Sequence, residues 1–347
     1  MDIDIKYDSS TLKNYKLVQP GDFIISLRSF QGGFETSYLT GITSPAYTIF
    51  NFIDNQSQNH MFWQYLFKRK NFINSLKKVT FGIRDGKAIS FSQFGDVKVE
   101  YPDFDEQKHI AITLNKIDDT IQLHERKCEE LALIKKVLLQ KLFPKKDEIK
   151  PEVRYKNFSD AWEQRKLGDL AEIVRGASPR PISDPKWFDD NSDIGWLRIS
   201  DVTNQNGRIY YLEQHISKLG QEKTRVITEP HLLLSIAATV GKPLINYIKT
   251  GVHDGFLIFL NPKFDLEYMY QWLEMFRPKW NKYGQPGSQV NLNSNLVRKQ
   301  KIALPSREEQ QRISSFLKQL DSLIALHQRK LERLKQLKKF LLQNMFI

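Results

Sequence analysis

One short stretch of the chain carries residues in the order of a metal-dependent nuclease centre. A Pro-Asp pair ending at Asp103 is followed by Glu106 and Lys108, which fits the Pro-Asp…Glu-x-Lys pattern. The stretch recurs 203 residues later, where Ser306 and Gln311 replace the aspartate and the lysine. Carboxylates also suit the positive end of a helix, which explains both copies. We therefore expect a helix start here, with single-chain DNA cleavage as the alternative.

Other catalytic patterns are missing from the sequence. It contains no Asn/Asp-Pro-Pro-Tyr/Phe motif of a methyltransferase, no Gly-x-Gly-x-x-Gly and no phosphate-binding loop. The turn at Gly241-Lys-Pro243 lacks the upstream glycine and the Ser or Thr that such a loop needs. The 7 histidines show no close metal-binding pair. We expect no catalytic centre, no metal site and no bound cofactor, and a single-chain methyltransferase is a further alternative.

The charge of the chain points to a polyanion as its partner. The net charge is +12 and the isoelectric point is near 9.4, which favours nucleic acid first and an anionic membrane second. We see no membrane-spanning apolar run and no signal peptide at the start. The single cysteine, Cys128, excludes a disulfide framework and fits a reducing cytoplasm.

Polar and basic residues in the expected loops are candidates for contacts with DNA phosphates and base edges. In the second half of the chain they are Arg175, Ser178, Arg180, Arg198, Lys223, Arg225, Thr239 and Lys242. An amide-rich loop suited to adenine edges contains Gln285, Ser288, Gln289 and Asn291. In the first half the candidates are Arg28, Ser29, Arg84 and Lys87. A solvated surface role is the alternative for each residue.

Two long helices must position these loops. The stretch from Pro102 to Phe143 aligns without a gap with the stretch from Pro305 to Phe346, and nearly half of the positions are identical. Each copy opens with a proline and a Glu-Gln pair, and neither contains an internal Pro or Gly. Each copy therefore predicts one helix of about 60 Å at 1.5 Å per residue.

Each helix carries an apolar stripe with steps of three and four residues, the spacing of a coiled-coil seam. The seam residues are Ile110, Leu114, Ile117, Ile121, His124 and Leu131 in the first copy, and Ile313, Leu317, Leu320, Ile324, His327 and Leu334 in the second. We predict that the two helices pack antiparallel along these stripes. His124 and His327 are expected to set the register rather than to bind metal. The alternative is a purely structural coiled-coil scaffold that does not bind DNA.

The globular parts repeat as well. Phe23–Leu27 matches Leu232–Ile236 at a shift of 209 residues, and Ile49-Phe50 matches Ile258-Phe259 at the same shift. The predicted fold is α+β, with two mixed globular domains separated by the helix pair. The domains are expected at 1–101, 102–144 (helix), 145–156 (linker), 157–304 and 305–347 (helix). The first globular part is expected to lack roughly the first 50 residues of the second.

The layout resembles the specificity subunit, HsdS, of Type I restriction–modification systems, and the resemblance covers essentially the whole chain. It is carried by Trp162, Leu167–Leu170, Gly176–Pro179, Leu233–Lys242, and the paired exits Val99–Ile110 and Ile302–Ile313. The resemblance implies two target recognition domains that each bind one half of a bipartite duplex DNA site. It implies partners as well: two modification subunits that methylate adenine with S-adenosylmethionine, and restriction subunits that use ATP and Mg²⁺.

The unequal repeat limits what the first globular part can read. A domain without its opening strands loses part of its core and part of its DNA face. We therefore expect residues 157–304 to carry most of the sequence preference, and we expect a second chain or fragment to complete the first domain.

Overall fold

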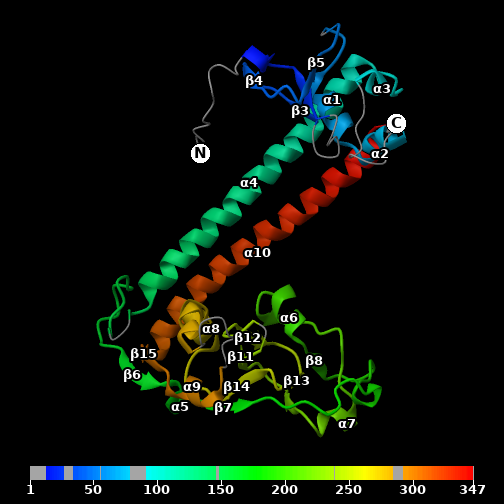
Figure 1. Ribbon diagram of the computed structural model, residues 1–347. Coiled ribbons are helices and arrows are strands. Elements are labelled where there is room, and N and C mark those ends of the chain that lie inside the picture. Colours follow the sequence, from blue (N-terminus) through cyan, green and yellow to red (C-terminus); the bar gives the residue numbers. More distant parts are fainter. Residues whose placement is uncertain are drawn as a thin grey trace. The chain divides into compact units, whose positions relative to one another are not determined.

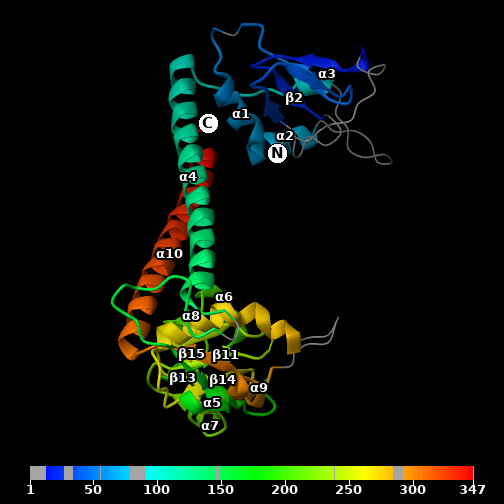
Figure 2. The ribbon, with the colours of Figure 1, turned by 90° about the vertical axis from the view of Figure 1, so that its left-hand side faces the viewer.

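The computed structural model describes residues 13–26, 34–54, 56–78, 91–145, 148–237, 239–283 and 292–346. The chain divides into two compact units, residues 1–127 with 327–347 (unit 1) and residues 128–326 (unit 2). Helices α4 (Phe104–Leu142) and α10 (Arg307–Asn344) each run through both units as unbroken ribbons (Figures 1 and 2). The division between the units thus falls inside the two long helices.

Unit 2 is built on three sheets. The five-stranded sheet has the order β7-β14-β11-β12-β9, the three-stranded sheet has the order β10-β13-β8, and β15 pairs with β6. Their bounds are β6 Glu163–Lys166, β7 Glu172–Arg175, β8 Gly195–Leu197, β9 Arg208–Ile209, β10 Arg225–Ile227, β11 Leu232–Ser235, β12 Pro243–Asn246, β13 Thr250–Val252, β14 Phe256–Leu260 and β15 Lys301–Leu304. The central strand β11 is buried along its length because Leu232 and Leu234 enter one core and Leu233 enters another.

Short helices cover these sheets. They are α5 Leu167–Leu170, η2 Pro185–Trp187, α6 Ile199–Asn204, α7 Lys218–Gln221, α8 Leu266–Phe276, η3 Arg277–Tyr283 and α9 Ser294–Lys299. Helix α8 begins at Asp265, whose carboxylate accepts a hydrogen bond from the Tyr268 backbone N–H. Its apolar face packs into the main core of unit 2.

Unit 1 has a smaller sheet core. Its elements are β1 Lys16–Val18, β2 Phe23–Ile25, β3 Phe34–Thr36, β4 Gly41–Thr43, β5 Thr48–Phe50, α1 His60–Lys68, α2 Lys70–Lys78 and α3 Phe91–Gly95. Strand β2 lies between β3 and β5, and β1 pairs with β4. Phe23, Phe34 and Phe67 form the centre of an aromatic core that also receives Leu114 from α4 and Phe346 at the end of the chain.

The predicted internal repeat is confirmed by the strand order. In unit 1 the order is β3-β2-β5, and the sequence-equivalent strands of unit 2 have the order β12-β11-β14. Both sets are antiparallel. The helix that follows is also equivalent: Asn59 caps α1 as Asp265 caps α8. Each unit therefore holds the same strand triplet and the same helix before its long helix.

The antiparallel pairing of the long helices is confirmed within each unit. In unit 1, Lys338 of α10 pairs with Asp118 of α4 at 2.6 Å. In unit 2, Lys135 of α4 pairs with Asp321 of α10. These two ion pairs are repeat equivalents, because 203 residues separate both the aspartates and the lysines. The described seam residues are all buried or half-buried.

The two seam histidines contact each other in unit 1. The Nδ1 atoms of His124 and His327 lie 2.7 Å apart, and their sequence separation is 203 residues, the repeat shift itself. A residue that contacts its own repeat equivalent must lie on the local two-fold axis of the pair, as at an isologous interface. One ring donates the proton and the other accepts it, so the contact cannot persist once both rings are protonated.

A buried glutamine joins each long helix to the rest of its unit. In unit 2, the Gln310 amide donates to the Pro305 carbonyl at 2.9 Å and accepts from the Asp265 backbone N–H at 2.8 Å. In unit 1, Gln107 makes the same two bonds, to Pro102 and from Asn59, at 2.9 and 3.0 Å. Both side chains are almost fully buried. The Glu-Gln pair of each exit therefore includes a structural clamp as well as an acidic helix start.

Two stretches next to the long helices differ from what their local sequence suggests. Val97–Tyr101 alternates apolar and polar residues as a strand does, but it has no strand assignment in the structure. Residues 145–156, expected as a charged linker, are partly docked: the Val153 N–H donates to the Lys141 carbonyl, and Arg154 pairs with Glu309. The prolines and charges of this stretch resemble those of a linker. Its docking could not be predicted from the local sequence, because the partner of Arg154 lies 155 residues away.

We predict that Gln310→Leu lowers the free energy of unfolding by about 1–3 kcal/mol, because the Pro305 carbonyl and the Asp265 N–H lose their buried partner. Gln311→Leu is the matched control, since Gln311 is exposed. Urea denaturation followed by circular dichroism measures both. Equal stabilities of the two variants would contradict the clamp.

We also predict a pH dependence from the histidine pair. Burial, then His124, Lys330 and Lys127, lower the pKa of His327. The unfolded chain binds a proton near pH 6.5 and the folded chain only at lower pH, so this contribution to stability is lost as the pH falls below about 6.5.

The melting temperature should therefore fall between pH 7.5 and pH 5.5, and His327→Gln should flatten that dependence. His109→Gln, at an exposed position of α4, should leave it unchanged. A dependence that is as steep in His327→Gln as in the unaltered chain would argue against the histidine contact.

Candidate nucleic-acid interface

The candidate DNA contacts of unit 2 gather at one end of its sheets. Strand β7 ends at Arg175, β14 starts at Phe256, and β11 ends at Ser235, and the antiparallel register places these ends side by side. In the three-stranded sheet, β13 ends at Val252 opposite Arg225, the first residue of β10. The turn from residue 253 to 255 connects the two sheets at this end. Chain topology thus brings together loops that are far apart in sequence.

Asp254 is the centre of this group. Its carboxylate accepts hydrogen bonds from the Ser178 hydroxyl at 2.9 Å and from the Arg180 guanidinium at 2.7 Å. Its backbone carbonyl accepts from Arg175 Nε at 2.6 Å, and the Arg175 carbonyl accepts from Arg225 Nε at 2.8 Å. The Arg175 and Arg180 side chains are 63% and 72% exposed. The cluster therefore holds arginine side chains in place while their charged ends face solvent.

The loop before the arginines approaches the turn closely because of Gly176. A Cβ atom at this position would lie 2.2 Å from the His253 carbonyl oxygen and 2.6 Å from that of Val252. The Gly176 and Ala177 backbone N–H groups donate to Phe256 and Val252 across the same gap. Only glycine permits this approach, which explains the Gly-Ala-Ser-Pro stretch singled out in the sequence.

The titration of Asp254 keeps the cluster charged. Burial would raise the pKa of Asp254, but the Ser178 hydrogen bond and the nearby His253, Arg180 and Arg175 lower it below its ordinary value. Burial lowers the pKa of His253, whose Nδ1 accepts from the Gly255 N–H at 2.8 Å. Asp254 is therefore ionised at neutral pH, and the cluster loses its anchor only in acid.

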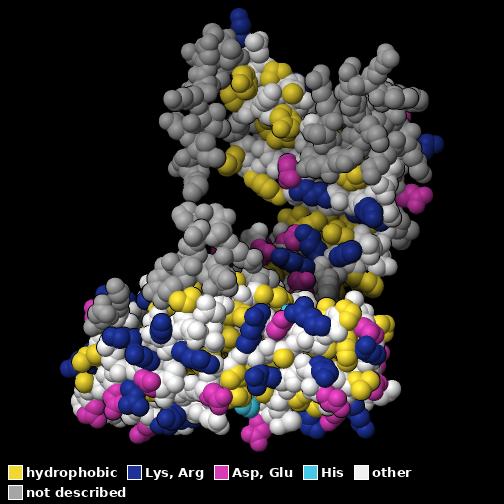
Figure 3. All heavy atoms as spheres, turned by 60° about the horizontal axis from the view of Figure 1, so that its bottom comes forward, with side chains coloured by type: hydrophobic (Ala, Val, Ile, Leu, Met, Phe, Trp, Pro, Cys, Tyr) yellow, Lys and Arg dark blue, Asp and Glu magenta, His cyan; other side chains and the backbone are white. Residues whose placement is uncertain are grey.

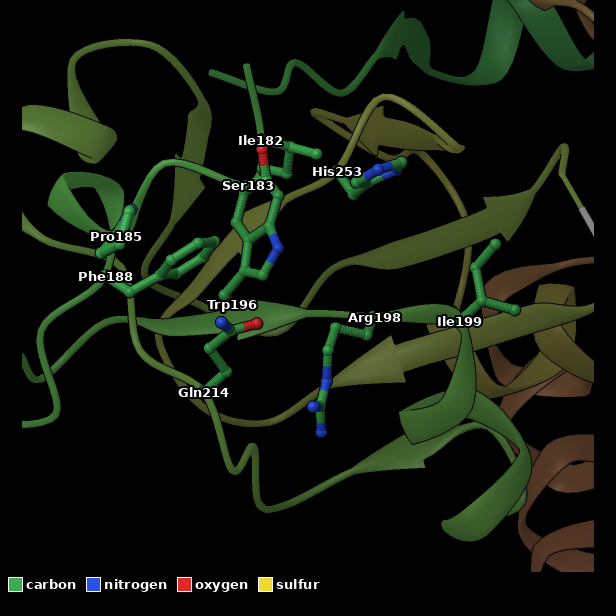
Figure 4. A pocket seen from close by; sticks show the side chains of 9 residues that line it. All are labelled: Ile182, Ser183, Pro185, Phe188, Trp196, Arg198, Ile199, Gln214 and His253. Carbon is green, nitrogen blue, oxygen red and sulfur yellow. The ribbon is translucent and has the colours of Figure 1, made fainter. Parts of the chain in front are cut away.

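A pocket of about 720 Å³ lies beside the cluster and shares its turn. Figure 4 shows the Trp196 indole between Phe188 and His253, and the ring centroids lie 6.4 and 5.8 Å from that of Trp196. The lining residues are Ile182, Ser183, Pro185, Phe188, Trp196, Arg198, Ile199, Gln214 and His253. An apolar wall with a few polar groups suits a flat ligand group, although Trp196 itself is almost fully buried.

The other candidates have different surroundings. Arg198 donates to Asp201 and Glu213 carboxylates, so its charge is largely compensated. Lys242 lies in the β11–β12 turn, where burial lowers its pKa. In the same turn the Thr239 hydroxyl is buried without a partner among the described residues. Lys223 is exposed.

The remaining candidates lie outside the described residues: Arg28, Ser29, Arg84, Lys87, Gln285, Ser288, Gln289 and Asn291. Sequence reasoning missed Asp254 and His253. The available sequence signal was the Asp-Gly pair at 254–255, which indicates a tight turn between two strands. It does not indicate that Arg175 and Arg180 contact this turn.

The nuclease-like residues at the start of α4 have an ordinary structural role. Asp103 accepts a hydrogen bond from the Glu106 backbone N–H, as a helix cap does. Asp103, Glu106 and Lys108 are all exposed. Over the described ranges, no group of three or more His, Cys, Asp or Glu side chains is arranged to hold a metal ion. Within the same ranges, no helix combines the length and the apolar character needed to span a membrane.

Comparison with known proteins places the chain in a family. Residues 5–133 and 159–336 match the Type I restriction modification DNA specificity domain. The chain belongs to this family. It is 26% identical over 282 residues to the putative type I restriction enzyme MjaX specificity subunit of Methanocaldococcus jannaschii, covering 79% of this chain and 63% of that protein.

Solved structures of specificity subunits share the fold. The HsdS subunit from Thermoanaerobacter tengcongensis superposes with a TM-score of 0.51 and 18% identity, covering 95% of this chain and 82% of that chain. The Type-I restriction-modification system S subunit from M. genitalium gives 0.62 and 13% identity, covering 96% and 85%. The predicted fold class, two mixed domains with paired long helices, is that of the specificity-domain family.

Because the Asp254 carboxylate accepts hydrogen bonds from Ser178 and Arg180, we predict that Asp254→Ala lowers the free energy of unfolding by about 1–3 kcal/mol. Asp190→Ala, at an exposed position of the same unit, should change it by no more than about 0.5 kcal/mol. Urea denaturation provides the comparison. An Asp254→Ala variant as stable as the Asp190→Ala variant would mean that the cluster is not held by this carboxylate.

Proposed function

We propose that this chain is the DNA-recognition subunit of a Type I restriction–modification complex and has no catalytic activity of its own. The observation that carries the proposal is the anchored arginine cluster at the sheet end of unit 2. Exposed guanidinium groups bind phosphates and guanine edges, and their fixed geometry lowers the entropy lost on binding. Family membership supports the same reading.

Phosphate contact and base readout have different requirements. The exposed Arg180 guanidinium is bonded to a carboxylate, which suits a contact that positions the duplex, whereas the exposed Arg175 at the end of β7 suits base readout. Figure 3 shows Lys and Arg side chains spread over one face of the molecule, among apolar and acidic ones. Such a distribution gives attraction along the backbone of the DNA, while a few side chains at the sheet end read the bases.

The long helices offer two equivalent surfaces for partner subunits. In unit 1, Leu123, Leu337 and Phe340 are exposed apolar side chains. Their repeat equivalents in unit 2 are Leu326, Ile134 and Val137, which are exposed as well. Exposed apolar groups that recur at equivalent positions indicate repeated binding of one kind of partner.

We propose that each surface binds one modification subunit, and that a restriction subunit can join the complex. S-adenosylmethionine would then belong to the modification subunits, and ATP and Mg²⁺ to the restriction subunits. The complex would act in the cytoplasm, where its DNA substrate lies. The Methanocaldococcus jannaschii relative is named as a putative type I restriction enzyme specificity subunit, which is consistent with such an assembly.

A mobility-shift series on duplex DNA tests the recognition proposal. Arg180→Ala should weaken binding and reduce the slope of log K against log[salt] by about 1, because one phosphate contact is lost. Lys263→Ala is the matched control: it removes one exposed positive charge after the opposite end of β14. The proposal fails if the chain does not bind duplex DNA, or if both variants bind alike.

Stoichiometry tests the partner surfaces. Replacing Leu337 and Phe340 by Glu together should reduce the number of bound modification subunits from two to one, since the equivalent surface in unit 2 is intact. Light scattering of the purified complex measures this number. Two subunits still bound, with unchanged affinity, would exclude this surface.

A further inference from the structure

In unit 2 a buried carboxylate holds a segment from the start of the globular part. The two oxygens of Glu309 accept hydrogen bonds from Arg154 Nε and NH2 at 2.7 and 2.8 Å. The Trp162 Nε1–H donates to the same carboxylate at 3.1 Å. Glu309 is only 1% exposed. A carboxylate at this depth requires charged and hydrogen-bonding partners, so the Arg–Trp segment and Glu309 belong together.

The same segment ends in a strand that completes the sheet edge before α10. Strand β6 pairs antiparallel with β15, with Lys301 opposite Lys166 and Leu304 opposite Glu163. Strand β15 leads through Pro305 directly to Glu309. The segment from Pro151 to Lys166 therefore binds two adjacent features, a strand edge and a carboxylate one helical turn further on.

Unit 1 has the equivalents of both features, and over its described residues neither is occupied. The repeat shift converts Lys301–Leu304 into Lys98–Tyr101 and converts Glu309 into Glu106. Val99 packs against the unit 1 core, as its equivalent Ile302 packs against the unit 2 core. Among the residues that the structure describes, no strand pairs with Lys98–Tyr101, and no side chain donates to the Glu106 carboxylate.

The surroundings of Glu106 are also open. Glu106 is exposed, whereas its equivalent in unit 2 is buried. Tyr101 and Phe104, on either side of the turn into α4, are 52% and 39% exposed. A stretch that is not paired with any described strand, next to exposed aromatic side chains and an exposed carboxylate, is a binding surface for an extended polypeptide.

We propose that this edge of unit 1 binds a polypeptide segment with the chemistry of residues 151–166. The segment would bring an arginine to Glu106, a tryptophan beside it, and a strand antiparallel to Lys98–Tyr101. Backbone hydrogen bonds would supply a part of the affinity that does not depend on sequence. The Arg–Glu pair, formed in a partly desolvated site, would supply the specificity. The inference concerns protein binding and does not rest on the DNA-recognition proposal.

The test uses the full chain and a fluorescein-labelled peptide with the sequence of residues 151–166. Fluorescence anisotropy should show saturable binding. Glu106→Arg should weaken it about tenfold or more, since a charge-assisted pair is replaced by repulsion. Asp105→Arg, an equal change of charge at the neighbouring exposed residue, should have a much smaller effect.

A charge exchange makes the assignment specific. A peptide in which Glu replaces the residue at position 154 should bind the Glu106→Arg chain better than it binds the unaltered chain. Hydrogen exchange should show that the backbone amides of residues 98–101 become protected when the unaltered peptide is bound.

Absence of binding at millimolar peptide would overturn the proposal. So would binding that is indifferent to Glu106→Arg, because the peptide would then be exchanging with its own copy in unit 2. The DNA mobility shift of the Glu106→Arg chain, measured in parallel, tells whether recognition by unit 2 is intact and so separates failure of this proposal from failure of the proposed function.

Discussion

The fold of each unit depends on one buried amide. Gln310 joins the carbonyl before α10 to the backbone N–H that begins α8, and Gln107 does the same for α4 and α1. In each unit both partners of the glutamine are backbone groups that would otherwise lack a hydrogen bond in the interior. Loss of the clamp would therefore lower the free energy of unfolding. The clamp fixes the direction in which a long helix leaves its sheet, because α8 packs in the same core as that sheet. Loops at the far end of the sheet are thereby held in a defined geometry.

The repeat extends from the sequence to individual hydrogen bonds. Tyr65 donates to Asp118 in unit 1, and Gln271, at the equivalent step of α8, donates to Asp321 in unit 2. Each aspartate also receives a lysine from the other long helix. Phe143 at the end of α4 packs on Tyr268, as Phe346 beyond α10 packs on Phe62. Two equivalent environments arise from one arrangement.

The repeat is broken where function requires a difference. Glu309 is buried by Arg154 and Trp162, whereas Glu106 is exposed. The described part of unit 1 contains the strand triplet and its helix but no counterpart of β6 among its paired strands. The arginine cluster around Asp254 depends on β7, β10 and β13, which flank the triplet in unit 2. The shared part of the repeat thus supports the helices, and the additional strands of unit 2 build the candidate DNA face.

The sequence was informative where periodicity and repetition dominate. The three-and-four spacing from Ile110 to Leu131 predicts the helix, and it places His124 and His327 in the seam, where the structure shows them in contact. It was less informative where distant loops meet. Nothing near Arg175 in the sequence indicates Asp254, because the turn that brings them together is set by sheet topology. The docking of Arg154 was hidden for the same reason, since a charged stretch between prolines is also what a linker looks like.

Selection of binding sites from a random duplex pool tests the central claim, that the sheet end of unit 2 reads DNA sequence. The account predicts that the chain, with its modification subunit, enriches a defined sequence, and that Arg175→Ala changes the preference at particular positions of it. Lys263→Ala should leave the enriched sequence unchanged. Enrichment of no sequence, or of one that is indifferent to Arg175→Ala, would contradict the account.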